Sequence, residues 1–116
     1  MLSLPASVRV FVAVAATDLR KGFDGLAQIT RDAIEQDPLS GHFFVFANRR
    51  RDRVKILYWD RDGFAVWMKR LEKGTFRWPA GDETHLEWSS VELAAVLGGI
   101  DLNETKKRPR YRLCAS

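Results

Sequence analysis

The sequence predicts a single α+β domain with a mainly antiparallel β-sheet of about five to six strands, one longer helix and one shorter helix. Three observations support this fold class. The chain has 116 residues, the size of one domain, and 46% of them are hydrophobic, enough for a packed core. Two aromatic and β-branched runs between Phe43 and Trp59 flank a short polar insert, a pattern typical of an antiparallel hairpin. Apolar residues from Phe23 to Ile34 recur mostly at helical spacing.

The N-terminal third is predicted to hold a strand followed by the longer helix. The segment Val8–Val14 is rich in β-branched residues and reads as a buried strand. Thr17-Asp18 is suited to cap a helix start, and the helix is expected from about Gly22 to Gln36. Asp37-Pro38 should end it, because the residue before a proline avoids the helical region.

The middle of the chain is predicted to be a series of hairpins. After the Phe43–Trp59 hairpin, the turn Asp60-Arg61-Asp62-Gly63 offers a glycine for positive φ. We expect Phe64–Leu71 to be a strand that turns at Glu72-Lys73-Gly74-Thr75 into a second strand, Phe76–Trp78. A helix over 64–73 is the alternative, since Met, Lys, Arg, Leu and Glu are good helix formers.

The C-terminal part is predicted to contain a short strand, Thr84–Trp88, and the shorter helix. Ser89 and Glu92 have the spacing of a capping box, and Gly98-Gly99 should stop the helix. We place the single domain at 1–102. Residues 103–116 turn polar and basic, and we expect them to form a flexible tail.

Composition limits the classes of function. The formal net charge is +4 with a pI of about 9.6, which favours acidic partners. Cys114 is the single cysteine, so neither an intrachain disulfide nor a cysteine-based zinc site is expected, and a reducing compartment is favoured. The apolar run Val8–Ala16 is too short to span a bilayer. We therefore expect a cytoplasmic protein without cofactor, metal or membrane.

The strongest functional signal is an arginine cluster at the tip of the predicted Phe43–Trp59 hairpin. Four like charges on one exposed loop repel each other, and an anion such as a nucleic-acid phosphate would screen them. The alternative is a solubilising turn. Arg20 and Lys21, near a predicted helix start, form a second candidate phosphate site, with an internal Asp18–Arg20 pair as the alternative. The candidate nucleic-acid-binding residues are Arg49, Arg50, Arg51, Arg53, Lys55, Arg20, Lys21, Lys106, Lys107, Arg108 and Arg110.

Aromatic residues raise a further possibility. Strand alternation places Phe43 and Phe44 on opposite faces of the sheet, and a helix can cover only one face. An exposed set of rings would offer stacking platforms for single-stranded nucleic acid or a surface for a protein. The alternative, favoured by strand spacing, is that the rings form the core. The rings concerned are Trp59, Trp67, Trp78, Trp88, Phe43, Phe44, Phe46 and Tyr58.

Catalysis is not expected. The carboxylates that might bind a metal for phosphoryl transfer mostly stand where Asp is favoured for local hydrogen bonds, in turns or at a helix entry. There is no glycine-rich phosphate loop and no His-carboxylate spacing typical of a metal site. The carboxylates considered are Asp18, Asp24, Asp60, Asp62, Asp82 and Asp101.

Several linked motifs resemble the TnpB accessory proteins of the IS66 family of bacterial insertion sequences. They extend from about Val10 to Asp101 and occur in the family's order. The motifs are Thr17-Asp18-Leu19-Arg20-Lys21-Gly22-Phe23-Asp24-Gly25-Leu26, Gly41-His42-Phe43-Phe44-Val45-Phe46 with the arginine cluster, Arg53–Asp60 and Lys69–Pro79.

The resemblance implies a protein encoded beside a separate transposase and associated with transposition, and it brings no catalytic residues. We therefore predict a non-enzymatic accessory protein that binds DNA, the transposase of the same element, or both. A protein-interaction adaptor without nucleic-acid binding and an RNA-binding regulator are the alternatives.

Overall fold

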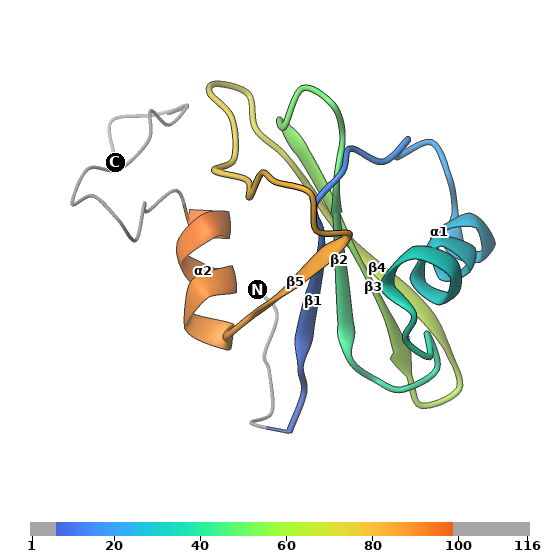
Figure 1. The fold of residues 1–116 in the computed structure, drawn as a ribbon. Helices are drawn as coiled ribbons and strands as arrows, with labels where there is room; N and C mark the ends of the chain where they lie inside the picture. The colour runs from blue at the N-terminus through green and yellow to red at the C-terminus, as the bar shows by residue number, and fades with distance from the viewer. Residues whose placement is uncertain (1–6, 99–116) are drawn as a thin grey trace, which may run out of the picture.

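A five-stranded sheet organises the computed structural model, which describes residues 7–98 (Figure 1). The predicted basic tail and the 102/103 domain boundary lie outside the described residues. The strand order is β4-β3-β2-β1-β5, and one longer and one shorter helix accompany the sheet, so the predicted α+β fold class is confirmed. The elements are β1 (Val10–Ala13), α1 (Phe23–Ile29) continued by a π-helical turn (Thr30–Ile34), β2 (Phe43–Ala47), β3 (Arg53–Asp60), β4 (Gly63–Arg70), β5 (His85–Trp88) and α2 (Ser90–Gly98).

The sheet is mainly antiparallel. β2, β3 and β4 form a meander, which confirms the predicted hairpin: Ala47 pairs with Val54 at one end of it and Phe44 with Leu57 at the other. β1 and β2 are parallel, and α1 makes the crossover between them. β5 pairs antiparallel with β1 and forms the edge of the sheet opposite to β4.

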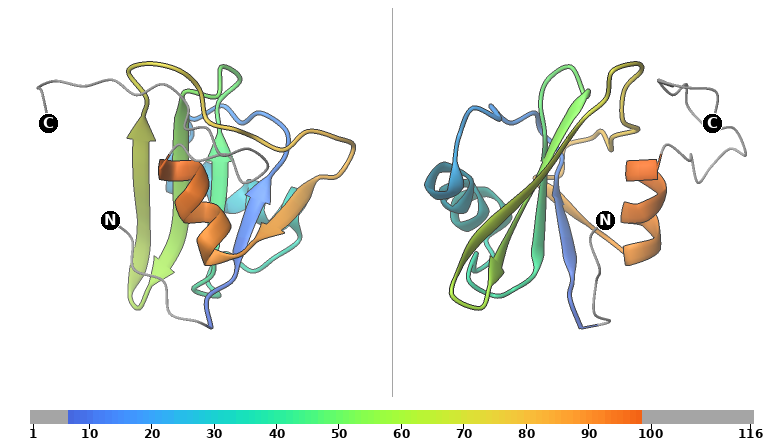
Figure 2. Two further views of the ribbon diagram at one scale, coloured as in Figure 1. Left: turned by 90° about the vertical axis from the view of Figure 1, so that its left-hand side faces the viewer. Right: turned by 180° about the vertical axis from the view of Figure 1, so that it is seen from behind.

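Helices cover both faces of the sheet, so the molecule has three layers (Figure 2). On one face Leu93 and Val96 of α2 pack on inward-facing residues of β1, β2 and β3. On the other face Leu26 and Ile34 pack on Phe44 and neighbouring residues. Each helix covers one face, as expected, but the connection after β1 and the segment after β5 lie on opposite sides of the sheet. The inference that one face would keep an exposed set of rings was therefore wrong.

The aromatic rings accordingly serve mainly as core. The three phenylalanines of β2 are 0–5% exposed, as expected for a central strand covered on both faces. Trp67, Trp78 and Trp88 are half-buried and pack against the core beneath α2. Trp59, at the far end of β3, contacts Phe64 edge-on, and its Nε1 donates to the carbonyl of Arg61.

The two helix starts differ from each other. Gly22 is the N-cap of α1 and no side chain caps it, so the expectation that Thr17-Asp18 caps this helix was wrong. The helix ends at Ile34, two residues before the predicted Gln36, and Glu35 takes a left-handed conformation with φ 59°. At α2 the capping box is confirmed: the Ser89 Oγ accepts from the backbone N–H of Glu92, whose carboxylate accepts from the N–H of Ser89.

The region after β3 confirms one prediction and corrects two. Phe64–Leu71 is a strand rather than a helix, since β4 covers 63–70. Phe76–Trp78 is not a strand, because β4 pairs with β3 across the short turn at Asp60–Gly63 instead of turning back at 72–75. In that short turn Arg61, not Gly63, has positive φ, at 58°.

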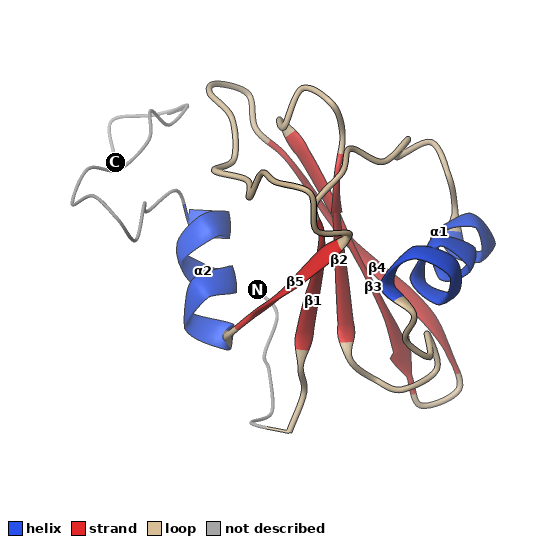
Figure 3. Ribbon diagram, in the orientation of Figure 1, coloured by secondary structure: helices blue, strands red, loops and turns tan. Residues whose placement is uncertain are grey.

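The segment after β4 crosses over the tip of the β2–β3 hairpin. The backbone N–H of Leu71 donates to the carbonyl of Asp52 at 2.7 Å, and that of Phe76 donates to the carbonyl of Arg51 at 2.7 Å. The indole of Trp78 donates to the carbonyl of Ala13 at 2.9 Å. Figure 3 shows the two loops side by side at one end of the sheet. The arginine loop is therefore supported from one side by the chain that follows β4.

Candidate nucleic-acid interface

The arginine loop is braced from inside by Asn48. Its Nδ2 donates to the carboxylate of Asp52 at 2.7 Å, and its Oδ1 accepts from the backbone N–H groups of Asp52 and Arg53, each at 3.1 Å. The hydrogen bond from Asn48, followed by the positive charges of Arg50 and Arg53, holds the pKa of Asp52 below its ordinary value. A defined loop, rather than a solvated coil, therefore presents the arginines.

Arg51 points inward, unlike its neighbours. Its φ is 60°, and its guanidinium donates to the carbonyl of Val14 at 3.1 Å and to that of Asn48 at 3.4 Å. The guanidinium also lies 5.6 Å from the ring centroid of Trp78. Partial burial lowers its pKa from the ordinary value, while leaving it charged. In this arrangement Arg51 ties the tip to the sheet.

The segment Thr17–Lys21 lies next to the loop. The N–H of Thr17 donates to the carbonyl of Ala47 at 2.8 Å, which joins the segment to the end of β2. The ammonium of Lys55 donates to the carbonyl of Leu19 at 2.6 Å and to that of Lys21 at 3.3 Å. Lys55 therefore holds this segment against the sheet.

Asp18 and Arg20 form the ion pair that the sequence left open as an alternative. The guanidinium of Arg20 donates to the Asp18 carboxylate at 2.8 to 3.2 Å, and the backbone N–H of Arg20 donates to the same group at 3.0 Å. The hydrogen bonds from Arg20 hold the pKa of Asp18 far below its usual range. The pair is open to water, with 92% of the Arg20 side chain exposed, so Arg20 is accessible to a further anion.

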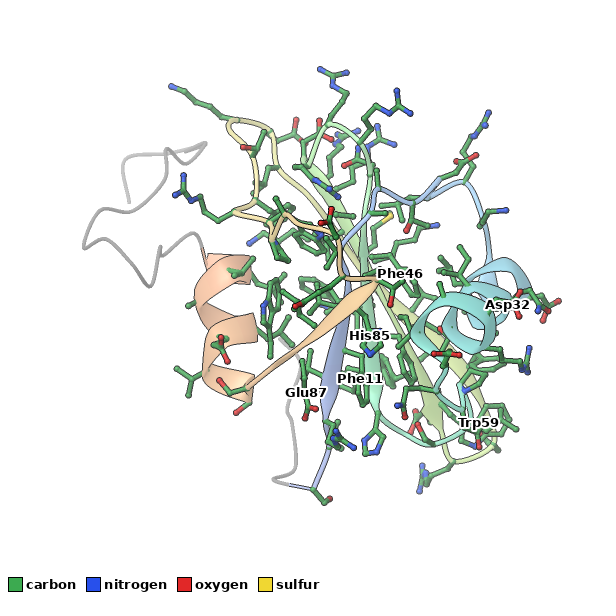
Figure 4. The ribbon with its side chains drawn as sticks, viewed as in Figure 1. Phe11, Asp32, Phe46, Trp59, His85 and Glu87 are labelled. Atoms are coloured by element: carbon green, nitrogen blue, oxygen red, sulfur yellow. The ribbon has the colours of Figure 1, made fainter. Side chains whose placement is uncertain are left out.

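These two segments enclose one open cavity of about 430 Å³. Four of the predicted site residues line it, with Asp18 as the acidic group in the lining. Lys21 does not line it, and Lys106, Lys107, Arg108 and Arg110 lie outside the described residues. In Figure 4 nitrogen-tipped side chains gather at this end of the sheet, whereas the labelled Trp59 and Glu87 lie toward the other end. The lining residues are Ala16, Thr17, Asp18, Leu19, Arg20, Asn48, Arg49, Arg50 and Arg53.

The arrangement is suited to binding an anion at the surface. Arg49, Arg50 and Arg53 are exposed, and each guanidinium is a planar donor fork that matches phosphate oxygens. The sequence predicted the two basic segments as separate sites. Their meeting follows from the parallel pairing of β1 with β2, which brings the chain after Ala13 beside the chain after Ala47. The bracing role of Asn48 was missed, although an Asn four residues before an Asp at a hairpin tip is a detectable signal.

Other kinds of site are less well supported in the part of the chain that the structure describes. Within residues 7–98, no three His, Cys, Asp or Glu side chains are grouped to hold a metal ion. In the same range no helix has the length and apolar character needed to cross a bilayer.

A second open cavity, of about 410 Å³, is lined by Arg51, which does not line the first cavity. Asp82 and Glu83 are also among its lining residues, so this cavity carries acidic groups.

The fold and the cavity define a small α+β protein that carries a cluster of arginines on one end of its sheet. The chain belongs to the family of IS66 Orf2-like proteins, whose model matches residues 8–107. This confirms the resemblance to the TnpB accessory proteins and makes the chain an insertion-sequence-associated protein.

Two relatives from Sinorhizobium fredii (strain NBRC 101917 / NGR234) are similar over most of their length. One, described as uncharacterized protein y4jC, is 33% identical over 112 residues, which are 97% of this chain and 96% of the relative. The other, uncharacterized protein y4hO, is 36% identical over 101 residues, 87% of this chain and 88% of the relative. No solved structure matches the chain.

Proposed function

We propose that this protein is a non-enzymatic accessory factor of insertion-sequence transposition that binds the phosphate backbone of DNA through the arginine-lined cavity. The single observation that carries the proposal is the convergence of Arg20, Arg49, Arg50 and Arg53 on one open cavity from two segments far apart in sequence. Partners with phosphates are favoured because several guanidinium groups face solvent together with one carboxylate, leaving a net positive site.

We propose two different roles for the cations near the cavity. Arg51 and Lys55 are committed to backbone carbonyls, so we assign them to positioning the two segments. Arg49, Arg50 and Arg53 are the proposed phosphate contacts, and Arg20 is a further one that shares its charge with Asp18. The transposase of the same element is the second proposed partner, in keeping with the family, and binds elsewhere on the protein or together with the DNA.

The test is a titration of DNA from the ends of the element at several salt concentrations. Replacing Arg49 and Arg50 with Ala should weaken binding and reduce the salt slope by about two units, roughly 0.9 for each phosphate contact. The matched control is Arg31→Ala with Arg61→Ala, which removes the same formal charge at exposed residues that do not line the cavity. Equal losses in both double variants would indicate a general charge effect and contradict a specific site.

The adaptor and RNA alternatives give different results in the same assay. If the parent protein does not bind DNA at low salt but captures the transposase, the protein is an adaptor. If RNA of the same sequence displaces DNA at a lower concentration than DNA itself does, the protein is an RNA-binding regulator. A capture experiment with the transposase, with and without element-end DNA, then shows whether the two partners bind together.

A further inference from the structure

One edge of the sheet is a long strand without a partner among the described elements. β4, eight residues from Gly63 to Arg70, stands at the end of the strand order, whereas the opposite edge, β5, has four residues. Figure 2 (left) shows β4 as the outermost strand of the sheet. A long edge strand without proline is a template for pairing with another chain, whereas a very short one is not.

The phase of the β3–β4 ladder shows which peptide groups of β4 face outward. The N–H of Leu71 donates to the carbonyl of Asp52, directly after the pair Arg53–Arg70. In an antiparallel ladder every second residue exchanges its hydrogen bonds with the neighbouring strand. The odd-numbered residues of β4 therefore bond to β3. The residues whose peptide groups point away from the sheet are Phe64, Val66, Met68 and Arg70.

The charges that usually protect an edge strand are bound within the protomer. The ammonium of Lys69 donates to the carbonyl of Leu97 at 2.9 Å. Arg70 is paired with Glu72 at 2.9 Å. Meanwhile Met68, between the apolar part of the strand and these charges, is 59% exposed. The edge thus keeps an apolar, pairing-competent stretch from Phe64 to Met68.

We propose that β4 pairs antiparallel with β4 of a second copy of this chain, about a two-fold axis at Val66. In this register Val66 faces Val66 of the second copy and Phe64 faces Met68, so apolar side chains meet on one face. One step beyond, Asp62 faces Arg70 of the second copy, which joins opposite charges at both ends. The two five-stranded sheets then form one continuous sheet.

Other registers with the same outward peptide groups are less favourable. An axis at Phe64 sets Asp60 against Met68 and Asp62 against Val66. An axis at Met68 sets Arg70 against Val66 and Glu72 against Phe64. Both place charges opposite apolar side chains. An axis at Ala65 sets Asp62 against Met68, and an axis at Trp67 sets Arg70 against Phe64, so these two registers have the same fault. Among the five registers, only the axis at Val66 pairs apolar side chains with each other and Asp62 with Arg70. Because β4 is complementary to itself in this register, a second copy of this chain is the partner that the edge strand fits.

The first test measures the mass of the full chain in solution by light scattering and sedimentation. The parent should have twice the 13.3 kDa of one chain and dissociate on dilution. Met68→Asp should shift it to the monomer, because a carboxylate would then face Phe64 of the second copy. Val91→Asp, at a residue 70% exposed on α2, is the matched control and should remain dimeric. A parent that is monomeric at all concentrations, or a dimer that persists in Met68→Asp, overturns the proposal.

The second test fixes the register and works even if Met68→Asp fails to fold. In a Cys114→Ser background, Val66→Cys should form a disulfide-linked dimer on mild oxidation, because opposite hydrogen-bonded residues have Cα atoms about 5.5 Å apart. Met68→Cys should not, because its counterpart lies four residues farther along the second strand, about 14 Å away. Equal cross-linking of both variants, or none by Val66→Cys, contradicts this pairing. Neither test involves DNA, so the outcome is independent of the proposed function.

Discussion

Asn48 and Asp52 face each other across the base of the arginine loop, with the Asn48 Nδ2 2.7 Å from the Asp52 carboxylate. The other amide atom of Asn48 accepts from two backbone N–H groups on the opposite side of the loop. The Asn48 side chain therefore binds one carboxylate and two backbone N–H groups at once, and it fixes the conformation of the loop that carries the exposed arginines. The following predictions start from this loop.

Asn48→Ala should lower the free energy of unfolding by about 1–3 kcal/mol, because the Asp52 carboxylate and two N–H groups lose their partner in a half-buried position. DNA affinity should also fall, since the loop loses its defined shape. Urea unfolding and the DNA titration measure the two effects. Gln28→Ala is a suitable control, because it removes an amide from an exposed helical pair with Asp32. Equal stability of Asn48→Ala and the parent would contradict the bracing role.

The state of Asp52 should make stability depend on pH. Its pKa lies below the ordinary 3.8 in the folded protein, chiefly because Asn48 donates to the ionised carboxylate. The folded state therefore gains from ionised Asp52 above the unfolded-state pKa, and loses this gain as pH falls through the folded-state pKa. In Asp52→Asn the loss of stability below about pH 4 should be smaller than in the parent. Thermal unfolding of both proteins across pH 2–6 tests this. The same decrease of unfolding temperature with falling pH in both proteins would contradict the prediction.

Arg51→Ala should destabilise the fold by about 1–2 kcal/mol, because two hydrogen bonds to carbonyls and the contact with Trp78 are lost from a partly exposed side chain. Arg50→Ala, at an exposed neighbour, should stay within about 0.5 kcal/mol of the parent. Chemical denaturation of the two variants separates the positioning arginine from the exposed one. If Arg50→Ala were less stable than Arg51→Ala, the contacts of the inward-pointing Arg51 would not contribute to stability.

Gly74→Val should cost on the order of 1–3 kcal/mol, because Gly74 has a φ of 79° and a β-branched residue is strained there. The matched control is Gly63→Val. Gly63 does not have positive φ, and a Cβ built there meets no atom within 4 Å, so valine should be tolerated at the start of β4. Thermal unfolding of both variants gives the comparison, and a Gly74→Val protein as stable as the control would be inconsistent with the turn.

Purified protein should neither cleave nor join DNA in the presence of Mg²⁺ or Mn²⁺. The reason is that the acidic group at the proposed DNA site, Asp18, is occupied by Arg20. Incubation of supercoiled plasmid and of element-end DNA with each metal measures this directly. Nicking that follows the protein through purification and disappears in Asp18→Ala or Asp60→Ala would show that the protein is an enzyme.

The hairpin at Phe43–Trp59 was predictable because both strands and their tip are contiguous in sequence, and the same holds for the Ser89–Glu92 capping box. The fate of Phe76–Trp78 was not, because it depends on tertiary contacts. The N–H of Phe76 and the indole of Trp78 bind carbonyls of the arginine loop and of β1, and these bonds replace a strand ladder. Local alternation of apolar and polar residues does not contain that information.

The candidate site was predicted in part. The arginine cluster was identifiable from its charge alone. Which arginine binds backbone carbonyls and which arginines are exposed was not identifiable. Arg51 and Arg50 are adjacent and chemically identical, but only Arg51 has a positive φ and a guanidinium bound to the Val14 carbonyl, and neither feature can be read from the residue type. The neighbouring Thr17–Lys21 segment joins the site through the parallel pairing of β1 with β2. Lys55, counted in the sequence as a phosphate contact, holds the segment there by donating to its carbonyls.

The pairing of Val10 with Trp88 has a consequence for synthesis of the protein. β1 leaves the ribosome first, but one of its two neighbours, β5, follows roughly 80 residues later, which at 5–20 residues per second is about 4–16 s. The β2–β3–β4 meander can form during this interval from local contacts, whereas the apolar β1 keeps one side without hydrogen-bond partners until β5 has been synthesised. Nascent chains stalled before His85 should therefore be the species that chaperones retain longest.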